Sequence, residues 1–116
     1  MLRALAAGFV VLTLTAPVAA EEPAITPETD KVMWCASAFF WLASSADDAG
    51  DASEAELYDG WATELIERGT ALLDADGFDL ARIQEIIGEY DQLVLEELAG
   101  EQARYDVAAC PELVAE

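Results

Sequence analysis

The stretch Val-Met-Trp-Cys-Ala-Ser-Ala-Phe-Phe-Trp-Leu-Ala-Ser-Ser-Ala, residues 32–46, has no charged side chain in a chain that contains 24 acidic and five basic residues. At about 100° per residue, this stretch would form a helix with two distinct faces. One face suits a protein core and carries Val32, Cys35, Ala36, Phe39, Leu42 and Ala43, with Met33 and Phe40 at its edge. The opposite face carries Trp34 and Trp41, seven residues apart, among small residues and serines. The stretch therefore predicts a core helix with an unusually apolar second face.

Apolar residues at helical spacing predict three long helices, over residues 27–46, 53–75 and 79–98. The first follows a Thr-Pro pair, which is typical of a helix start. The second begins at Ser53, which forms a capping box with Glu56. No stretch shows the alternation of a strand or a hairpin turn. The sequence thus predicts an all-α fold, a small bundle of three or four helices.

The chain has two cysteines, Cys35 and Cys110, and we expect them to form a disulfide. The bond would close a loop of 75 residues, for which the chain-entropy relation gives about 4.5 kcal/mol. In an up-down-up bundle the third helix runs parallel to the first, and a straight continuation would carry Cys110 away from Cys35. We therefore expect the chain to break near Gly100 and to return as a fourth, shorter element.

Residues 1–20 have the pattern of a secretory signal peptide, with Arg3, an uncharged apolar run, a break at Pro17 and small residues at the end. The apolar run is too short to cross a bilayer, which takes about 20 residues. We expect cleavage to leave one helical domain, 21–116, with a short leader at 21–26. The protein would then lie in the periplasm without a stable membrane span, and an uncleaved anchor is the alternative.

The composition excludes several function classes. The formal net charge is −19, yet 54% of the residues are hydrophobic, which argues against a disordered acidic tail. Nucleic-acid-binding proteins present basic surfaces, so we expect no nucleic-acid partner. The chain has no histidine, which removes the commonest general base and zinc ligand. We expect no cofactor.

The sequence Asp-Ala-Asp-Gly-Phe-Asp at residues 74–79 resembles the start of a calcium-binding EF-hand loop. The resemblance implies three oxygen ligands, from Asp74, Asp76 and Glu85. It departs from the motif at Phe78 and Asp79, where an oxygen ligand and a glycine are needed. A helix-to-helix turn explains the same residues, with Gly77 as a left-handed cap and Asp79 as the next N-cap, and we favour that interpretation.

Trp34 and Trp41 are the candidate partner-binding residues. Buried tryptophans are typical anchors of protein interfaces. The alternative is that the C-terminal segment covers this face with its apolar residues, Val107, Leu113 and Val114. We predict a small exported acidic helical protein, not an enzyme, that binds a protein partner or itself through the aromatic face of its first helix.

Two other functions are kept as alternatives. The layout is similar to that of periplasmic acid-stress chaperones, which are small exported helical proteins with one disulfide and a tryptophan near the first cysteine. The many carboxylates also permit a small carboxylate-based enzyme or a cation-binding domain. However, acidic residues such as Glu64 and Glu89 lie off the apolar stripes and suit a solvated surface.

Overall fold

The computed structural model describes residues 22–115. Its elements are α1 (Pro27–Asp48), α2 (Ala52–Ala75), α3 (Leu80–Ala99), the 3₁₀ turn η2 (Val107–Ala109) and α4 (Pro111–Ala115). No β-strand occurs among these residues. The predicted all-α bundle with one disulfide is confirmed. The expected signal peptide, residues 1–20, lies outside the described part of the chain.

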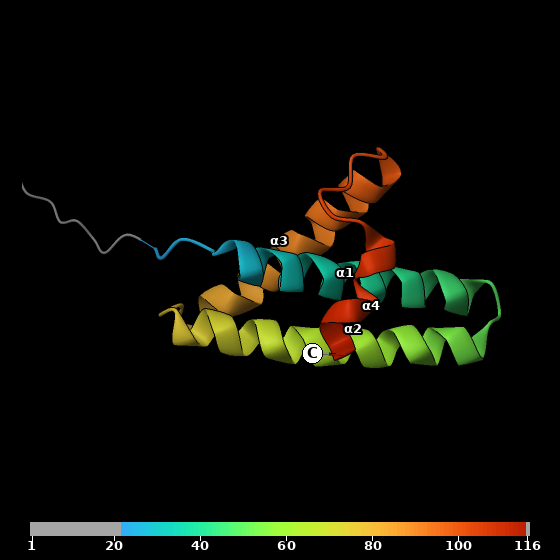
Figure 1. The fold of residues 1–116 in the computed structure, drawn as a ribbon, viewed down its shortest axis with the longest axis horizontal. Coiled ribbons are helices and arrows are strands. Elements are labelled where there is room, and N and C mark those ends of the chain that lie inside the picture. The colour runs from blue at the N-terminus through green and yellow to red at the C-terminus, as the bar shows by residue number, and fades with distance from the viewer. Residues whose placement is uncertain (1–21, 116) are drawn as a thin grey trace, which may run out of the picture.

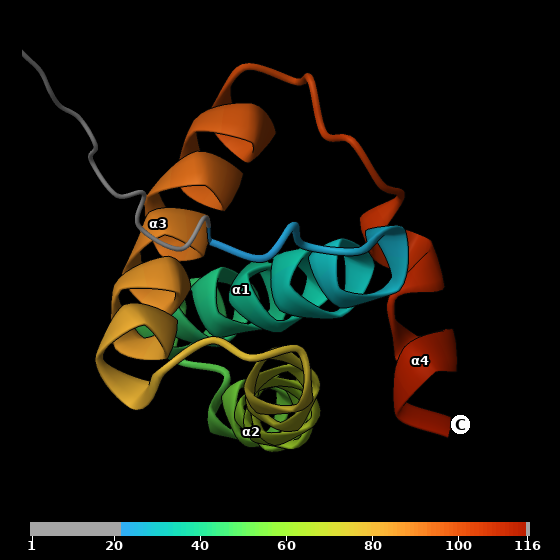
Figure 2. The same ribbon diagram turned by 90° about the vertical axis from the view of Figure 1, so that its left-hand side faces the viewer.

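The helices α1 and α2 form a long antiparallel hairpin whose closing turn extends beyond the other helices, at the right of Figure 1. Figure 2 shows α3 and α4 on opposite sides of α1, with the chain after α3 arching over α1 before it descends to α4. The third helix crosses α1 obliquely, so the expected parallel stacking of these two helices is wrong. The far end of the hairpin therefore consists of two helices only.

Side-chain caps set the starts of the three long helices. Thr26 Oγ1 accepts a hydrogen bond from the Thr29 amide at 3.2 Å, and Asp79 Oδ1 accepts one from the Arg82 amide at 2.8 Å. The predicted capping box at Ser53 is wrong, because Asp51 Oδ1 caps α2 by accepting from the amide of residue 54 at 3.0 Å. The helix therefore starts one residue earlier, at Ala52, and an aspartate satisfies one of its first free amides.

The central part of α1 is buried on every side. All eight residues from 32 to 39 are buried, including Met33, Trp34 and Ala38, whose exposed fraction is 0%. A helix that is apolar all round belongs in a core, and here α2, α3 and the C-terminal segment enclose it. The two faces predicted for this helix therefore both lie in the core over residues 32–39.

A glycine lets α1 and α2 approach closely. A Cβ at Gly69 would overlap the Met33 sulfur, whereas a Cβ at Gly60 would meet no atom within 4 Å. Met33 is fully buried and occupies the space that Gly69 leaves. Close helix approach therefore depends on Gly69.

The chain breaks after α3 and returns to α1 as predicted. Gly100 is the C-cap of α3, and Glu101 has a positive φ of 57°, which turns the backbone away from the helix direction. The disulfide joins Cys35 of α1 to Cys110, with 5.6 Å between the two Cα atoms. The short helix α4 follows directly after this bond, so the disulfide fixes the C-terminal segment against the centre of α1.

Candidate functional site

Trp34 lies inside the fold, which corrects the expectation that both indoles face a partner. Its exposed fraction is 0%, and its Nε1 donates a hydrogen bond to Glu97 Oε1 at 3.0 Å. The ring of Tyr105 meets the indole edge to face, with 5.7 Å between ring centroids. The cover comes from α3 and from Tyr105 of the returning segment. Trp34 is therefore unavailable to a partner of the folded protein.

Trp41 is partly exposed and is held by α3. Its Nε1 donates to the main-chain oxygen of Asp91 at 2.9 Å. The Asp91 side chain in turn accepts from the Ser37 hydroxyl at 2.6 Å. The neighbouring Phe40 ring contacts the Trp41 ring edge to face, at a centroid distance of 5.0 Å. Trp41 thus fixes the crossing of α1 and α3, and Phe40 lies beside it on the surface.

Asp30 is the centre of a polar network that holds the returning segment. Its two carboxylate oxygens accept from the hydroxyls of Tyr90 and Tyr105, each at 2.6 Å, and Arg104 Nη1 donates to it at 3.2 Å. Burial, together with the hydrogen bond to this carboxylate, raises the pKa of Tyr105 to about 12. The same two causes raise the pKa of Tyr90. Both hydroxyls therefore stay protonated and donate at neutral pH.

Glu97 joins the network to Trp34. Its carboxylate accepts from Arg104 Nη2 at 2.7 Å and from the Arg104 amide at 3.2 Å, in addition to the indole of Trp34. The hydrogen bonds from Arg104 lower the pKa of Glu97, and the indole lowers it further, against an opposing effect of burial. The ionised carboxylate is the form that this network favours.

The three cation ligands suggested by the EF-hand resemblance are not brought together. Residues 22–115 contain no group of three acidic or cysteine side chains placed to hold a metal ion. Glu85 pairs with Arg82 at 3.3 Å, whereas Asp74 and Asp76 lie exposed at the end of α2. Gly77 has a φ of +102°, and the residue after it is buried, as the turn interpretation predicts.

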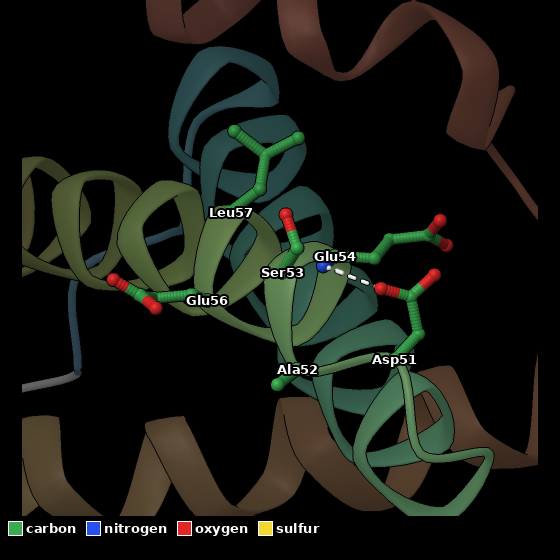
Figure 3. Close-up of a pocket in the computed structure, with 6 residues that line it drawn as sticks. All are labelled: Asp51, Ala52, Ser53, Glu54, Glu56 and Leu57. Atoms are coloured by element: carbon green, nitrogen blue, oxygen red, sulfur yellow. Dashed lines mark hydrogen bonds between the residues drawn. The ribbon is translucent and has the colours of Figure 1, made fainter.

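A hollow at the start of α2 lacks the form of a binding site. Its lining consists of the side chains drawn in Figure 3, namely Asp51, Ala52, Ser53, Glu54, Glu56 and Leu57. All six come from one helix start, and the side chains of Glu54, Glu56 and Leu57 point in different directions (Figure 3). The polar interaction drawn there is the Asp51 cap itself. We therefore assign no ligand to this hollow.

A groove runs along the α1–α2 hairpin on the side that faces α3. It consists of two adjoining cavities, of about 240 and 370 Å³, which share Phe40 and Asp59 in their linings. We call this surface the hairpin groove. The residues that line it are Ala36, Ser37, Phe40, Ala43, Ser44 and Asp47 of α1, Ala55, Glu56, Asp59, Ala62, Thr63 and Ile66 of α2, and Ile87 and Asp91 of α3.

The hairpin groove combines apolar and acidic side chains. Phe40 is its largest apolar side chain, with an exposed fraction of 46%. Aliphatic side chains and alanines make up most of the remaining apolar lining. Four carboxylates also line it, those of Asp47, Glu56, Asp59 and Asp91, and no basic residue does. Such a lining suits a ligand that is apolar on one side and positively charged beside it.

The sequence interpretation placed Phe40 only at the edge of the core face and missed the groove. Positions 40, 43, 44 and 47 follow one another at helical spacing, which was the available signal on α1. The contribution of Ile87 and Asp91 had no such signal, because it depends on where α3 crosses the hairpin.

Comparison with protein-family models, with curated proteins and with solved structures finds no match to this chain. In the part of the chain that the structure describes, no helix combines the length and hydropathy needed to cross a bilayer. Function is therefore inferred from the shape and charge of the surfaces described above.

Proposed function

We propose that this chain is an exported, non-catalytic protein of the periplasm that binds a protein partner or a second copy of itself. The signal-peptide pattern of residues 1–20 supports export. The disulfide between Cys35 and Cys110 is compatible with an oxidising compartment. The binding surface in this proposal is the hairpin groove, and Trp34 contributes to the core instead.

The observation that carries the proposal is the exposure of Phe40 in a lined groove. The neighbouring residues on α1, from 32 to 39, are buried, yet Phe40 keeps 46% of its surface exposed between two helices. The adjacent cavities leave room for a partner's side chains against this ring. Burial of exposed apolar surface is the dominant favourable contribution in most protein association.

Photo-crosslinking tests this proposal. A photoreactive phenylalanine analogue placed at Phe40 is expected to form adducts with another protein, or with a second copy, in cells that produce the protein naturally. The same analogue at Gln84, an exposed position on α3, is the control. Adducts that depend on position 40 support binding through the groove. Equal yields at the two positions, or no adduct at either, would contradict it.

A second candidate, binding of unfolded proteins in acid, is favoured by the network over Trp34. Two carboxylates, Asp30 and Glu97, hold the returning segment against the indole through Arg104 and Tyr105. Protonation of Glu97 would weaken its charged hydrogen bonds to Arg104 and expose apolar surface around the indole. Suppression of the aggregation of an acid-denatured test protein, measured by light scattering, would support this candidate. Suppression that is equal at neutral pH would contradict it.

A further inference from the structure

We infer that the occupant of the hairpin groove is a basic amphipathic helix of another protein. This inference rests on the proposed function and specifies the chemistry of the partner. An amphipathic helix lays its apolar face into a groove of matching length, with anchors three, four and seven residues apart. Three properties of the groove argue for this occupant: its charge, its length and the secondary structure around it.

Charge selects a basic partner. The carboxylates of Asp47, Glu56 and Asp59 line the groove along both helices of the hairpin, and Asp91 adds a fourth from α3. The formal net charge of −19 adds a long-range attraction for a cationic segment. Lysine or arginine side chains that flank the apolar face of a bound helix would meet these carboxylates, while the apolar face contacts Phe40.

Charge also argues against a second copy of this chain as the occupant. The sequence has only five basic residues. Arg68, Arg82 and Arg104 are each engaged in ion pairs within the protein. A second copy would therefore bring mainly further negative charge to an acidic groove, and like charges in contact oppose association.

Length and secondary structure select a helix. The α1 residues that line the groove run from Ala36 to Asp47, which corresponds to about 16 Å, or roughly three helical turns. The surrounding elements are helices, whose main-chain groups are already bonded within each helix. An extended peptide would find no strand edge among the residues that line the groove, whereas a helix satisfies its own main-chain groups. A helical segment thus avoids the cost of unpaired polar groups in an apolar groove.

A synthetic probe tests the inference directly. The probe is a fluorescent peptide of about 18 leucine and lysine residues with all leucines on one helical face. One control peptide has the same composition with the leucines spread around the helix, and a second has glutamate in place of lysine. Fluorescence anisotropy should show binding of the first peptide only, and the affinity should fall as salt is added.

Matched variants separate the groove from general charge attraction. We compare two double variants. One combines Glu56→Gln and Asp59→Asn, both in the groove, and the other combines Glu67→Gln and Glu96→Gln, both exposed outside it. Each pair removes two negative charges. The groove pair should weaken binding by roughly tenfold and the control pair much less, and Phe40→Ala should also weaken it by at least roughly tenfold. Circular dichroism verifies that each variant is folded.

Each other outcome overturns the inference. No binding of the amphipathic basic peptide excludes this partner class, and equal losses in the two double variants show non-specific attraction. Equal binding of the peptide with spread leucines would remove the requirement for an amphipathic helix, and equal binding of the glutamate peptide would remove the requirement for positive charge. If sedimentation shows that the unchanged protein is a dimer and that Phe40→Asp is a monomer, the occupant is a second copy. Crosslinking at Phe40 without peptide binding would retain the proposed function and reject only the basic helix.

Discussion

The indole ring of Trp34 is buried, and its nitrogen has a hydrogen-bond partner within the fold. The ring has no exposed surface, and Nε1 donates to Glu97. Trp34→Ala should lower the free energy of unfolding by about 3–5 kcal/mol, because it removes a large buried side chain and leaves a cavity. Urea denaturation measures the change. Phe40→Ala is the control and should cost much less, since that ring is 46% exposed. Equal losses in the two variants would contradict the burial of Trp34.

Glu97 makes stability depend on pH in the acidic range. Its pKa is lowered from 4.5 by the hydrogen bonds from Arg104, so the unfolded state takes up the proton at higher pH than the folded state does. The stabilisation is therefore complete above about pH 4.5 and is lost as pH falls through the lowered value. Thermal denaturation of Glu97→Gln should show a weaker loss of stability in acid than the unchanged protein.

The exposed neighbour Glu96 supplies the control for this titration. Glu96→Gln removes the same charge from α3 without touching Arg104 or Trp34. Its acid transition should follow that of the unchanged protein. If Glu97→Gln and Glu96→Gln shift the transition equally, the titration does not come from the network over Trp34.

Residue patterns predicted the core of α1 better than its surface. The lack of charge between residues 32 and 46 indicated a buried helix, and this is confirmed along the first half. The expectation for Trp34 was wrong because a helical projection shows which residues share a face and not which neighbours cover it. Its cover comes from residues 97 and 105, more than 60 positions away.

Within α2, two glycines with the same helical conformation should respond oppositely to alanine. Gly69→Ala places a methyl group on the buried Met33 side chain, whereas Gly60→Ala meets no atom within 4 Å. Overpacking of a core typically costs about 1–3 kcal/mol, and alanine in an open helical site gains about 1 kcal/mol. Thermal denaturation should therefore give a lower midpoint for Gly69→Ala and a higher one for Gly60→Ala. A stabilised Gly69→Ala protein would show that α1 and α2 are not in close contact there.

The disulfide adds a covalent link to the polar network that already joins the returning segment to α1. It ties the C-terminal segment, with α4, to the middle of α1. Cys110→Ala should lower the free energy of unfolding by about 2–5 kcal/mol, because the unfolded chain loses a long covalent loop. Adding a reductant should lower the denaturation midpoint of the unchanged protein to a similar extent and leave that of the variant in place. An unchanged midpoint in both experiments would contradict a structural role for the bond.

Helix ends were predicted where local chemistry decides them. Thr26, Asp79 and Gly100 act as caps as their residue types suggest, because a cap depends on neighbours within a few positions. The start of α2 differed because Asp51 and Ser53 both suit an N-cap, and the sequence does not rank them. The oblique crossing of α3 was not predicted, since it depends on the packing of side chains from several helices at once.

Across the whole molecule, the candidate site arises from this crossing. The closing end of the α1–α2 hairpin extends beyond α3, so α3 leaves that end of both helices uncovered. The groove begins where α3 contributes Ile87 and Asp91 to its lining. The sequence predicts an acidic helical domain whose first helix has a second apolar face. It assigned this surface to Trp34 and Trp41 and not to Phe40, because the packing of α3, which buries Trp34 and holds Trp41, is not visible in the sequence.

The net charge of −19 should make the stability of the molecule rise with moderate salt. Folding brings the carboxylates closer together, and added NaCl screens their repulsion, since the Debye length falls to about 10 Å at 0.1 M. The same salt also weakens exposed ion pairs such as those of Arg82, but each such pair contributes little. The thermal midpoint should therefore increase between low salt and 0.1 M NaCl. The increase should be smaller in the double variant Glu67→Gln, Glu96→Gln, because it has two fewer negative charges. A midpoint that falls steadily with NaCl would show that the ion pairs outweigh the repulsion.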